Sequence, residues 1–369
     1  MNQLFRWDQM GLFLLALAAG ILPFAVPEVC AAALREGLTL CSGPLLLSLF
    51  PFLVVSRLLI QCPESDLLAL PFRLAAWGIG IRTPCAARVL CIGFLGGFAP
   101  AASAAAQAVR TGQLTAEEAD ALLPACICSG PSFVVLTVGQ SLLGSAELGV
   151  LLFASQITAN YLTAALLNRF AAVRSVKPGS AAPASPAPPR LDEILADAAI
   201  TYCKLCGFIL FFRMLAAGAG ALLPAGAGTL CSILLEVCSG CDLASRTGRW
   251  GSLLCCAALS VQGLSVLLQV RTICPPEMTL RPLYRARMLH LPLSLALFYL
   301  LLPGGEADVF STLPARILLM RRVPPDCALL VFAVCCMAAC TLRSGIRQVE
   351  QKQMARNAGG CCINSKTLL

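Results

Sequence analysis

The chain has 369 residues, of which 58% are hydrophobic and 12% are charged, and it carries a formal net charge of +8. Because soluble globular proteins average about 25% charged residues, this composition excludes an ordinary soluble protein. The cations lie mostly between apolar runs, where they flank membrane segments, and the stacking aromatic residues of a nucleic-acid groove are missing. We therefore predict an all-α, multi-pass membrane protein whose partner is the lipid bilayer and not a nucleic acid.

Apolar runs follow one another along the chain, at 11–26, 40–60, 86–109, 128–143, 148–168, 199–223, 226–241, 252–270, 288–303 and 327–342. Since a helix needs roughly 20 apolar residues to cross the hydrocarbon layer, they predict about eight to ten hydrophobic segments. Asp8 precedes the first run and does not fit the basic leader of a signal peptide, so we interpret this run as a retained membrane helix. The runs at 86–109, 128–143 and 226–241 contain glycine, proline or an acid, which predicts half-helices or re-entrant segments.

A short polar segment, 110–124, joins two of these runs. Thr115 stands three residues before Glu118, which is the spacing of a capping box, so a helix should begin near Ala116. Its acidic residues predict a connecting helix that lies in water.

The run at 128–143 opens with Ser129, Gly130, Pro131 and Ser132. Pro131 lacks an N–H and disfavours the α conformation in the residue before it, but it is well tolerated at the start of a helix. A helix that begins afresh there would present free N–H groups with a partial positive charge, which is a binding site for an anion. Such breaks are tolerated where they line a cavity. The alternative interpretation is a simple proline kink.

Residues 171–190 are rich in proline, alanine and serine and predict a linker outside the membrane. This linker separates a first membrane half, 1–170, from a second, 191–342, and a basic tail, 343–369, follows. The halves share Leu49/Leu205, Phe52/Phe208, Arg57/Arg213, Leu59/Leu215 and the motif Gly130-Pro131-Ser132 against Gly263-Leu264-Ser265. Matches in the same order indicate an internal duplication, which is typical of transporters that bind substrate between their repeats.

Glu236 is the strongest site candidate of the second half, because a charged side chain at the bilayer centre costs roughly 3 kcal/mol. It requires a cavity, a proton or a cationic partner, unless it lies at a helix end and reaches the interface. Ser239 and Gly240 follow it, and we predict that a break near Gly240 meets the Gly130–Pro131 break at one cavity.

The run at 252–270 contributes a further group of polar or small residues, Gln262, Gly263, Ser265 and Gln269. Buried amides and hydroxyls need hydrogen-bond partners. These residues either contact the substrate or hold helices together.

The residues of an enzyme are not present in any recognisable arrangement. The single histidine is His290, and paired carboxylates, a phosphate loop and a nucleophile elbow are missing. The 21 cysteines lie mostly inside apolar runs, where cysteine acts as a small hydrophobic residue. Two CxxC pairs, Cys203–Cys206 and Cys238–Cys241, would form a zinc site only if they converged. We expect no catalytic activity, no cofactor and no metal.

Three consecutive motifs, GFLGGFAPAA (93–102), RTGQLTAEEADALLPAC (110–126) and CSGPSFVVLTVG (128–139), resemble the Gate, or nucleoside-recognition, domain of the YlbJ sporulation membrane proteins. LLEVCSG (234–240), GLSVLLQV (263–270) and LYRARMLH (283–290) are similar to motifs of that family in the second half. The resemblance implies two Gate-like repeats.

The family, also named SpoVV, is assigned to moving dipicolinate across the outer forespore membrane of sporulating bacteria. The resemblance therefore implies a transporter of this small dianion, in a divergent member with altered polar residues: Ser103 stands where the family has lysine, and Ile127 and Cys128 where it has two asparagines. A carrier of a nucleoside-like or other metabolite and a non-transporting scaffold for spore-envelope assembly are the alternatives. Substrate, coupling ion, orientation and oligomeric state are left open.

Overall fold

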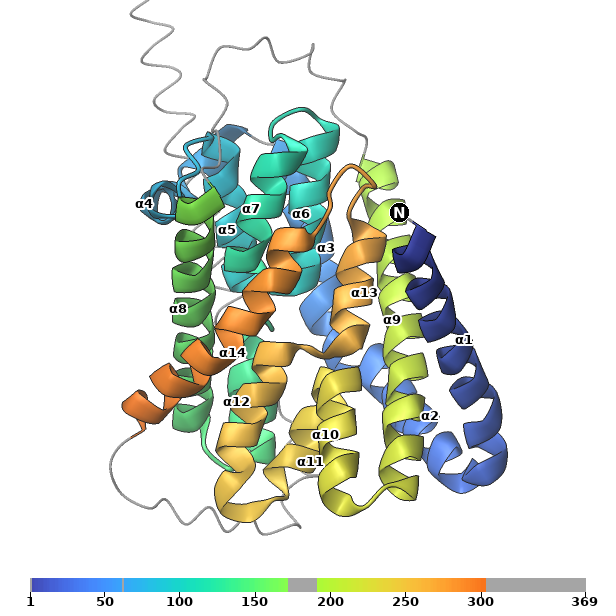
Figure 1. The fold of residues 1–369 in the computed structure, drawn as a ribbon. Coiled ribbons are helices and arrows are strands. Elements are labelled where there is room, and N and C mark those ends of the chain that lie inside the picture. Colours follow the sequence, from blue (N-terminus) through green and yellow to red (C-terminus); the bar gives the residue numbers. More distant parts are fainter. Residues whose placement is uncertain (1, 62, 172–190, 303–369) are drawn as a thin grey trace, which may run out of the picture.

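The structure is a computed structural model that describes residues 2–61, 63–171 and 191–302 (Figure 1). The predicted linker from residue 172 onward, the run at 327–342 and the tail at 343–369 lie outside the described residues. Within the described ranges the chain is helical and contains no strand, which confirms the all-α prediction. The elements are α1 (Asn2–Ala25), α2 (Pro27–Ser42), α3 (Pro44–Gln61), η1 (Pro63–Asp66), α4 (Leu70–Gly78), α5 (Pro84–Gly96), α6 (Phe98–Arg110), α7 (Ala116–Cys126), η2 (Ser132–Leu142), α8 (Ala146–Ala171), α9 (Leu191–Leu222), α10 (Ala225–Leu235), α11 (Val237–Ser245), η3 (Gly248–Trp250), α12 (Gly251–Val261), α13 (Gly263–Ile273) and α14 (Arg281–Leu301).

Two helical hairpins enter the bundle from opposite ends. α5 packs against α6 and α10 packs against α11, and Figure 1 places the first hairpin at one end of the bundle and the second at the other. We call the end where α6 ends and α7 begins the α7 end, and the end where α9 ends and α10 begins the α10 end. In the first half, α5 and α6 are followed by the interrupted segment α7–η2 and then by the long helix α8. In the second half, α10 and α11 are followed by the interrupted segment α12–α13 and then by the long helix α14. The same order of elements thus occurs twice, in opposite directions.

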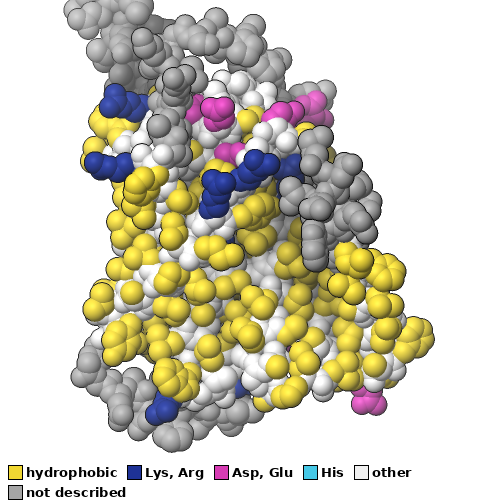
Figure 2. All heavy atoms as spheres, in the orientation of Figure 1, with side chains coloured by type: hydrophobic (Ala, Val, Ile, Leu, Met, Phe, Trp, Pro, Cys, Tyr) yellow, Lys and Arg dark blue, Asp and Glu magenta, His cyan; other side chains and the backbone are white. Residues whose placement is uncertain are grey.

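Apolar side chains cover the middle of the molecule. Ala146–Phe170, Leu191–Leu222 and Gly248–Ile273 are long and apolar enough to cross a membrane, and α1 with α2, bent by 110°, counts as a fourth crossing if the pair forms one broken span. Phe24 and Leu300 are 89% and 77% exposed, and Figure 2 shows hydrophobic side chains over most of the visible face, with charged side chains gathered toward the ends. Such a surface is unsuited to water and suited to a lipid environment. The chain is a multi-pass membrane protein.

Small side chains form the centre of the bundle. Almost every residue of α6 from Ala99 to Ala108 is buried, and most are alanine. Because lipid gives little hydrophobic drive for helices to associate, small residues that let backbones approach closely are the usual means of packing in membranes. α6 accordingly packs against α3, α5, α7 and α13.

α7 begins where the sequence predicts, but it does not lie in water. Thr115 and Glu118 form the predicted capping box, whereas Glu118 and Asp120 are 2% and 6% exposed. Glu118 accepts a hydrogen bond from Thr83, and Asp120 accepts three from the Thr279–Leu280 turn. The prediction of a solvated helix is wrong because these two carboxylates tie α7 to neighbouring segments at the α7 end.

Cations are distributed unevenly between the two ends. The connections and helix termini of the α7 end carry Arg73, Arg82, Arg110, Arg169, Arg271 and Arg281, and those of the α10 end carry Arg246 and Arg249, among the described residues. Lys and Arg are in excess in the cytoplasmic connections of membrane proteins. We therefore expect the α7 end to face the cytoplasm.

An epitope inserted between Thr111 and Gly112 should be reached by antibody only after permeabilisation of the cells. The same epitope between Thr247 and Gly248 should be reached in intact spheroplasts, since it lies at the α10 end. Both insertions fall between helices, next to the exposed residues Gly112 and Thr247, and both variants should reach the membrane at the level of the parent. The reverse pattern of accessibility would contradict the orientation.

Candidate functional site

The first helix break separates α5 from α6 at Gly97, inside the run where the sequence predicts an interruption. Gly97 has a φ of +81°, and a Cβ built on it would lie 2.7 Å from the backbone nitrogen of Gly130. Only glycine combines this backbone conformation with such a close approach. The break of the first hairpin therefore crosses directly against the second break of the same half.

The second break lies between α7 and η2. α7 ends at Cys126, Ile127 is extended, and the chain resumes helical geometry at Pro131, as predicted. No side chain caps the new helix, so Ser129 does not compete for its first N–H groups. η2 is a π-helix, a form that is rare and occurs often at functional sites.

The third break separates α10 from α11 at Glu236, four residues before the predicted position at Gly240. Glu236 is extended and 2% exposed. Its carboxylate accepts hydrogen bonds from the amides of Cys238 and Ser239, at 2.8 and 2.7 Å, and from the Ser239 hydroxyl at 2.9 Å. The start of α11 thus holds the buried charge, as helix N-termini do. Gly240 lies within α11 and packs on Ile233, where a Cβ would meet the Ile233 Cα at 2.8 Å.

The fourth break interrupts the run at 252–270, which the sequence did not mark as broken. Gln262 and Gly263 both adopt the left-handed conformation, with φ of +62° and +70°. A Cβ on Gly263 would lie 2.9 Å from backbone atoms of Leu235 and Glu236, so this break crosses the third one as Gly97 crosses Gly130. Gly263 was the one weak signal that the sequence offered, because glycine adopts the left-handed conformation readily.

The four breaks meet around one central cavity of about 60 Å³. Its lining takes residues from the first three breaks and from α3, α9 and α13, the helix that follows the fourth break: Leu45, Leu49, Leu95, Gly96, Phe98, Ser129, Gly130, Ser132, Phe133, Ile209, Glu236, Val237, Cys238, Val266 and Gln269. Both halves therefore contribute to the same space. At this volume the cavity holds about two water molecules.

Five of the predicted site residues line this central cavity, namely Ser129, Gly130, Ser132, Glu236 and Gln269. The other five lie close by. Pro131 begins the helix, Gly240 and Gly263 make close backbone contacts, Ser239 lines a neighbouring cavity at the α10 end, and Ser265 accepts a hydrogen bond from Gln269 at 2.9 Å. The Oε1 atom of Gln269 is buried and has no hydrogen-bond partner.

Arg287 on α14 was not identified as a site residue from the sequence. It is 7% exposed, and its guanidinium donates to the carbonyl of Ile127 at 2.6 Å and to that of Ser260 at 3.3 Å. Asn160 also donates to the Ile127 carbonyl, at 3.2 Å. Cations are stabilised near the C-terminal ends of helices, so Arg287 compensates the carbonyls that the second and fourth breaks leave free. The available signal was an arginine directly before the apolar run at 288–303.

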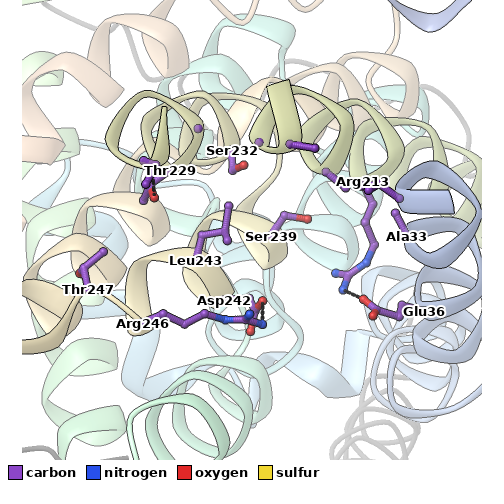
Figure 3. A pocket seen from close by; sticks show the side chains of 16 residues that line it. Ala33, Glu36, Arg213, Thr229, Ser232, Ser239, Asp242, Leu243, Arg246 and Thr247 are labelled. Atoms are coloured by element: carbon purple, nitrogen blue, oxygen red, sulfur yellow. Dashed lines mark hydrogen bonds and ion pairs between the residues drawn. The ribbon is translucent and has the colours of Figure 1, made fainter. Parts of the chain in front are cut away.

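A larger cavity of about 520 Å³ opens between α2, α9, α10 and α11 at the α10 end (Figure 3). Arg213 points toward Glu36 across it, and Arg246 pairs with Asp242 on α11. Ser239 faces this cavity, while its neighbours Glu236 and Cys238 line the central one. The first turn of α11 therefore separates the two cavities.

A third cavity, of about 160 Å³, lies at the α7 end between α3, α6, α9 and α13. Its lining includes Arg57, Arg110, Lys204 and Asp197. Three cations and one carboxylate make it a net positive space, which favours anions.

The cysteines contribute no metal centre in the described part of the chain. The predicted pairs lie on α9 and α11, and within the described ranges no group of three or more His, Cys, Asp or Glu side chains could hold a metal ion.

Comparison of the chain with protein-family models, with curated proteins and with solved structures gives no match. A function for this chain is therefore inferred from the geometry of the breaks and cavities.

Gly263→Ala should lower the melting temperature of the detergent-solubilised protein clearly more than Gly207→Ala does. The left-handed conformation costs a non-glycine residue about 1–2 kcal/mol, and the new Cβ would also press on the backbone of the third break. Gly207 lies on α9 with nothing within 4 Å of its Cβ position. Equal melting temperatures by scanning fluorimetry would show that the crossing of the two breaks is not required.

Proposed function

We propose that this chain is a membrane transporter of a small organic anion, which binds where the four helix breaks meet. The observation that carries the proposal is the central cavity, lined by three of the breaks, by the helix that follows the fourth, and by both halves. Broken helices inside a membrane are tolerated where they line a protein cavity. Two halves of opposite direction with a site between them are the usual construction of secondary transporters.

The start of η2 is the anion-binding element of this proposal. Its first turn lacks a capping side chain, and Ser129, Gly130 and Ser132 line the cavity beside it. The corresponding start of α11 is already occupied by the carboxylate of Glu236. The helix start at α11 is therefore filled by the protein's own anion, whereas the start of η2 is available for the substrate's.

Gln269 supplies a second polar contact. Its Oε1 is buried without a partner, while its Nε2 donates to Ser265. Rotating the amide by half a turn presents the NH₂ to an anion and lets the serine hydroxyl donate to the amide oxygen. The residue thereby offers a donor to the substrate without losing its contact to Ser265.

The central cavity is too small for such a substrate in this state. Pockets that hold ligands have volumes of about 300–1,000 Å³, whereas this one measures about 60 Å³. A dicarboxylate on a small ring fits only when the halves separate. The larger and smaller cavities at the two ends supply the routes by which it reaches the centre.

Dipicolinate export across the outer forespore membrane is the finer form of the proposal, and it rests on the resemblance to the YlbJ family. Dipicolinate is a small dianion, which suits an uncapped helix start. Uptake of labelled dipicolinate into proteoliposomes, beside a nucleoside control, tests it. Uptake of the nucleoside alone would indicate the metabolite carrier, and uptake of neither would indicate a non-transporting role.

Ser129→Asp should abolish transport of the anion while the protein remains folded and inserted. The added carboxylate occupies the positive helix start and stabilises it by about 0.3–1 kcal/mol, but it repels the substrate's carboxylate. Ser129→Ala should be much milder because the backbone donors survive. Uptake is compared at equal membrane abundance. If Ser129→Asp transports as well as the parent, the anion does not bind at this helix start and Pro131 only kinks the chain.

Glu236→Gln should reduce transport more than it reduces stability. The neutral amide no longer compensates the first turn of α11, so a second positive helix start faces the cavity and holds the anion too tightly. We expect both kcat and KM to fall, with kcat lower by about tenfold, which corresponds to roughly 1.4 kcal/mol. Glu147→Gln, at the exposed start of α8, serves as the control. An unchanged kcat at equal membrane abundance would show that Glu236 takes no part in the transport cycle.

A further inference from the structure

Among the described residues, two ion pairs join the halves of the chain. Arg57 on α3 donates to Asp197 on α9 at 2.5 Å, and Arg213 on α9 donates to Glu36 on α2 at 2.8 Å. In each pair one half supplies the arginine and the other supplies the carboxylate. The two arginines also occupy matched positions of the duplicated motif, in 49-LFPFLVVSRLL-59 and 205-LCGFILFFRML-215.

The partners of each pair differ sharply in burial. The side chains of Arg57 and Arg213 are 10% and 14% exposed, whereas those of Asp197 and Glu36 are 62% and 66% exposed. The Nε atom of each arginine is buried and has no hydrogen-bond partner. Each guanidinium is thus fixed and incompletely satisfied, while its carboxylate is solvent-exposed and held weakly.

A row of residues four apart along α9 connects these pairs to the central cavity. Each step of four residues turns by about 40° on a helix of 3.6 residues per turn, so the row winds around α9 as it passes from one end to the other. Asp197, Thr201 and Leu205 line the cavity at the α7 end, Ile209 lines the central cavity, and Arg213, Ala217 and Ala221 line the cavity at the α10 end. Asp197 and Arg213 are separated by roughly 24 Å of helix at 1.5 Å per residue, which is most of a hydrocarbon layer of roughly 30 Å.

We propose that Arg57 and Arg213 are two equivalent carboxylate-binding stations, one at each end of the central cavity. The proposal rests on the proposed transport function and adds the residues that receive the substrate on either side. At rest the protein's own carboxylate, Asp197 or Glu36, occupies the guanidinium. A carboxylate of the substrate displaces it, because the planar guanidinium binds carboxylates through two parallel hydrogen bonds.

Displacement also changes the contact between the halves. Each resident carboxylate belongs to the half opposite its arginine, so a substrate that replaces it breaks an interaction between the halves at that end. Binding at a station therefore loosens the end through which the substrate arrives. Arg110 and Lys204, which line the cavity beside Arg57, increase the local concentration of anions there.

Substituting each partner of an ion pair in turn distinguishes a carboxylate-binding station from a purely structural ion pair, because the two roles predict different directions of change in substrate affinity. Arg57→Gln and Asp197→Asn remove the same ion pair, and so do Arg213→Gln and Glu36→Gln. Loss of a structural contact affects both members of a pair in the same direction. A station predicts opposite effects, since the first change removes the binding group and the second removes its competitor.

The test is the dissociation constant of dipicolinate for the purified, detergent-solubilised chain, measured by titration calorimetry. We expect Arg57→Gln and Arg213→Gln to weaken binding about tenfold or more, and Asp197→Asn and Glu36→Gln to tighten it several-fold. The matched control is the Arg88–Asp66 pair, which has similar burial, 11% and 41%, but lies within one half and lines none of the three cavities. Arg88→Gln and Asp66→Asn should leave the constant unchanged.

The outcomes distinguish the stations from the transport function. The stations would be overturned if both substitutions of a pair weakened dipicolinate binding, or if the Arg88–Asp66 substitutions changed the dissociation constant equally. They would also be overturned if the parent did not bind dipicolinate. Binding with the expected signs but without uptake into proteoliposomes would retain the stations and overturn the transporter. Uptake by the parent with unchanged constants in all variants would retain the transporter and overturn the stations.

Discussion

Interrupting a helix inside a membrane leaves backbone N–H and C=O groups without partners, and each such group costs several kcal/mol in hydrocarbon. In the described part of the chain, four such breaks lie around the central cavity, and they cross in two pairs. Arg287 and Asn160 satisfy the carbonyl freed after α7, and Glu236 satisfies the amides that open α11. The starts of α6, η2 and α13 have no such side chain. Of these, the start of η2 presents Ser129, Gly130 and Ser132 to the cavity, and it is the one that we propose a substrate completes.

The close crossing of the breaks depends on glycine in two places. Gly97 lies against Gly130 in the first half, and Gly263 lies against Glu236 in the second. The second contact brings a left-handed glycine to the residue whose side chain caps α11. Packing and charge compensation are therefore coupled at this point, because a displaced backbone at Glu236 would also move the carboxylate away from the amides that hold it.

Hydropathy alone predicts the helical membrane fold, and local chemistry predicts several of its details. The missing N–H of Pro131 marks the start of η2, and the spacing of Thr115 and Glu118 marks the start of α7. The partners of buried charges are not predictable in the same way, because they depend on which segments meet. Asp120 bonds a turn 159 residues away, and Glu236 caps its own helix only because the chain breaks at that residue. The break at Gln262 escaped prediction since a left-handed glutamine has no strong signature in sequence.

The two end cavities are unequal, about 520 Å³ at the α10 end and about 160 Å³ at the α7 end. The halves repeat one order of elements in opposite directions, so a fully symmetric arrangement would give both ends the same cavity. The difference means that the halves adopt different local conformations in this state. If the halves exchanged these conformations, the larger cavity would lie at the α7 end and the central site would be approached from the other side. For a transporter, the inverted order of elements thus supplies two alternative states from one set of contacts, with the central cavity common to both.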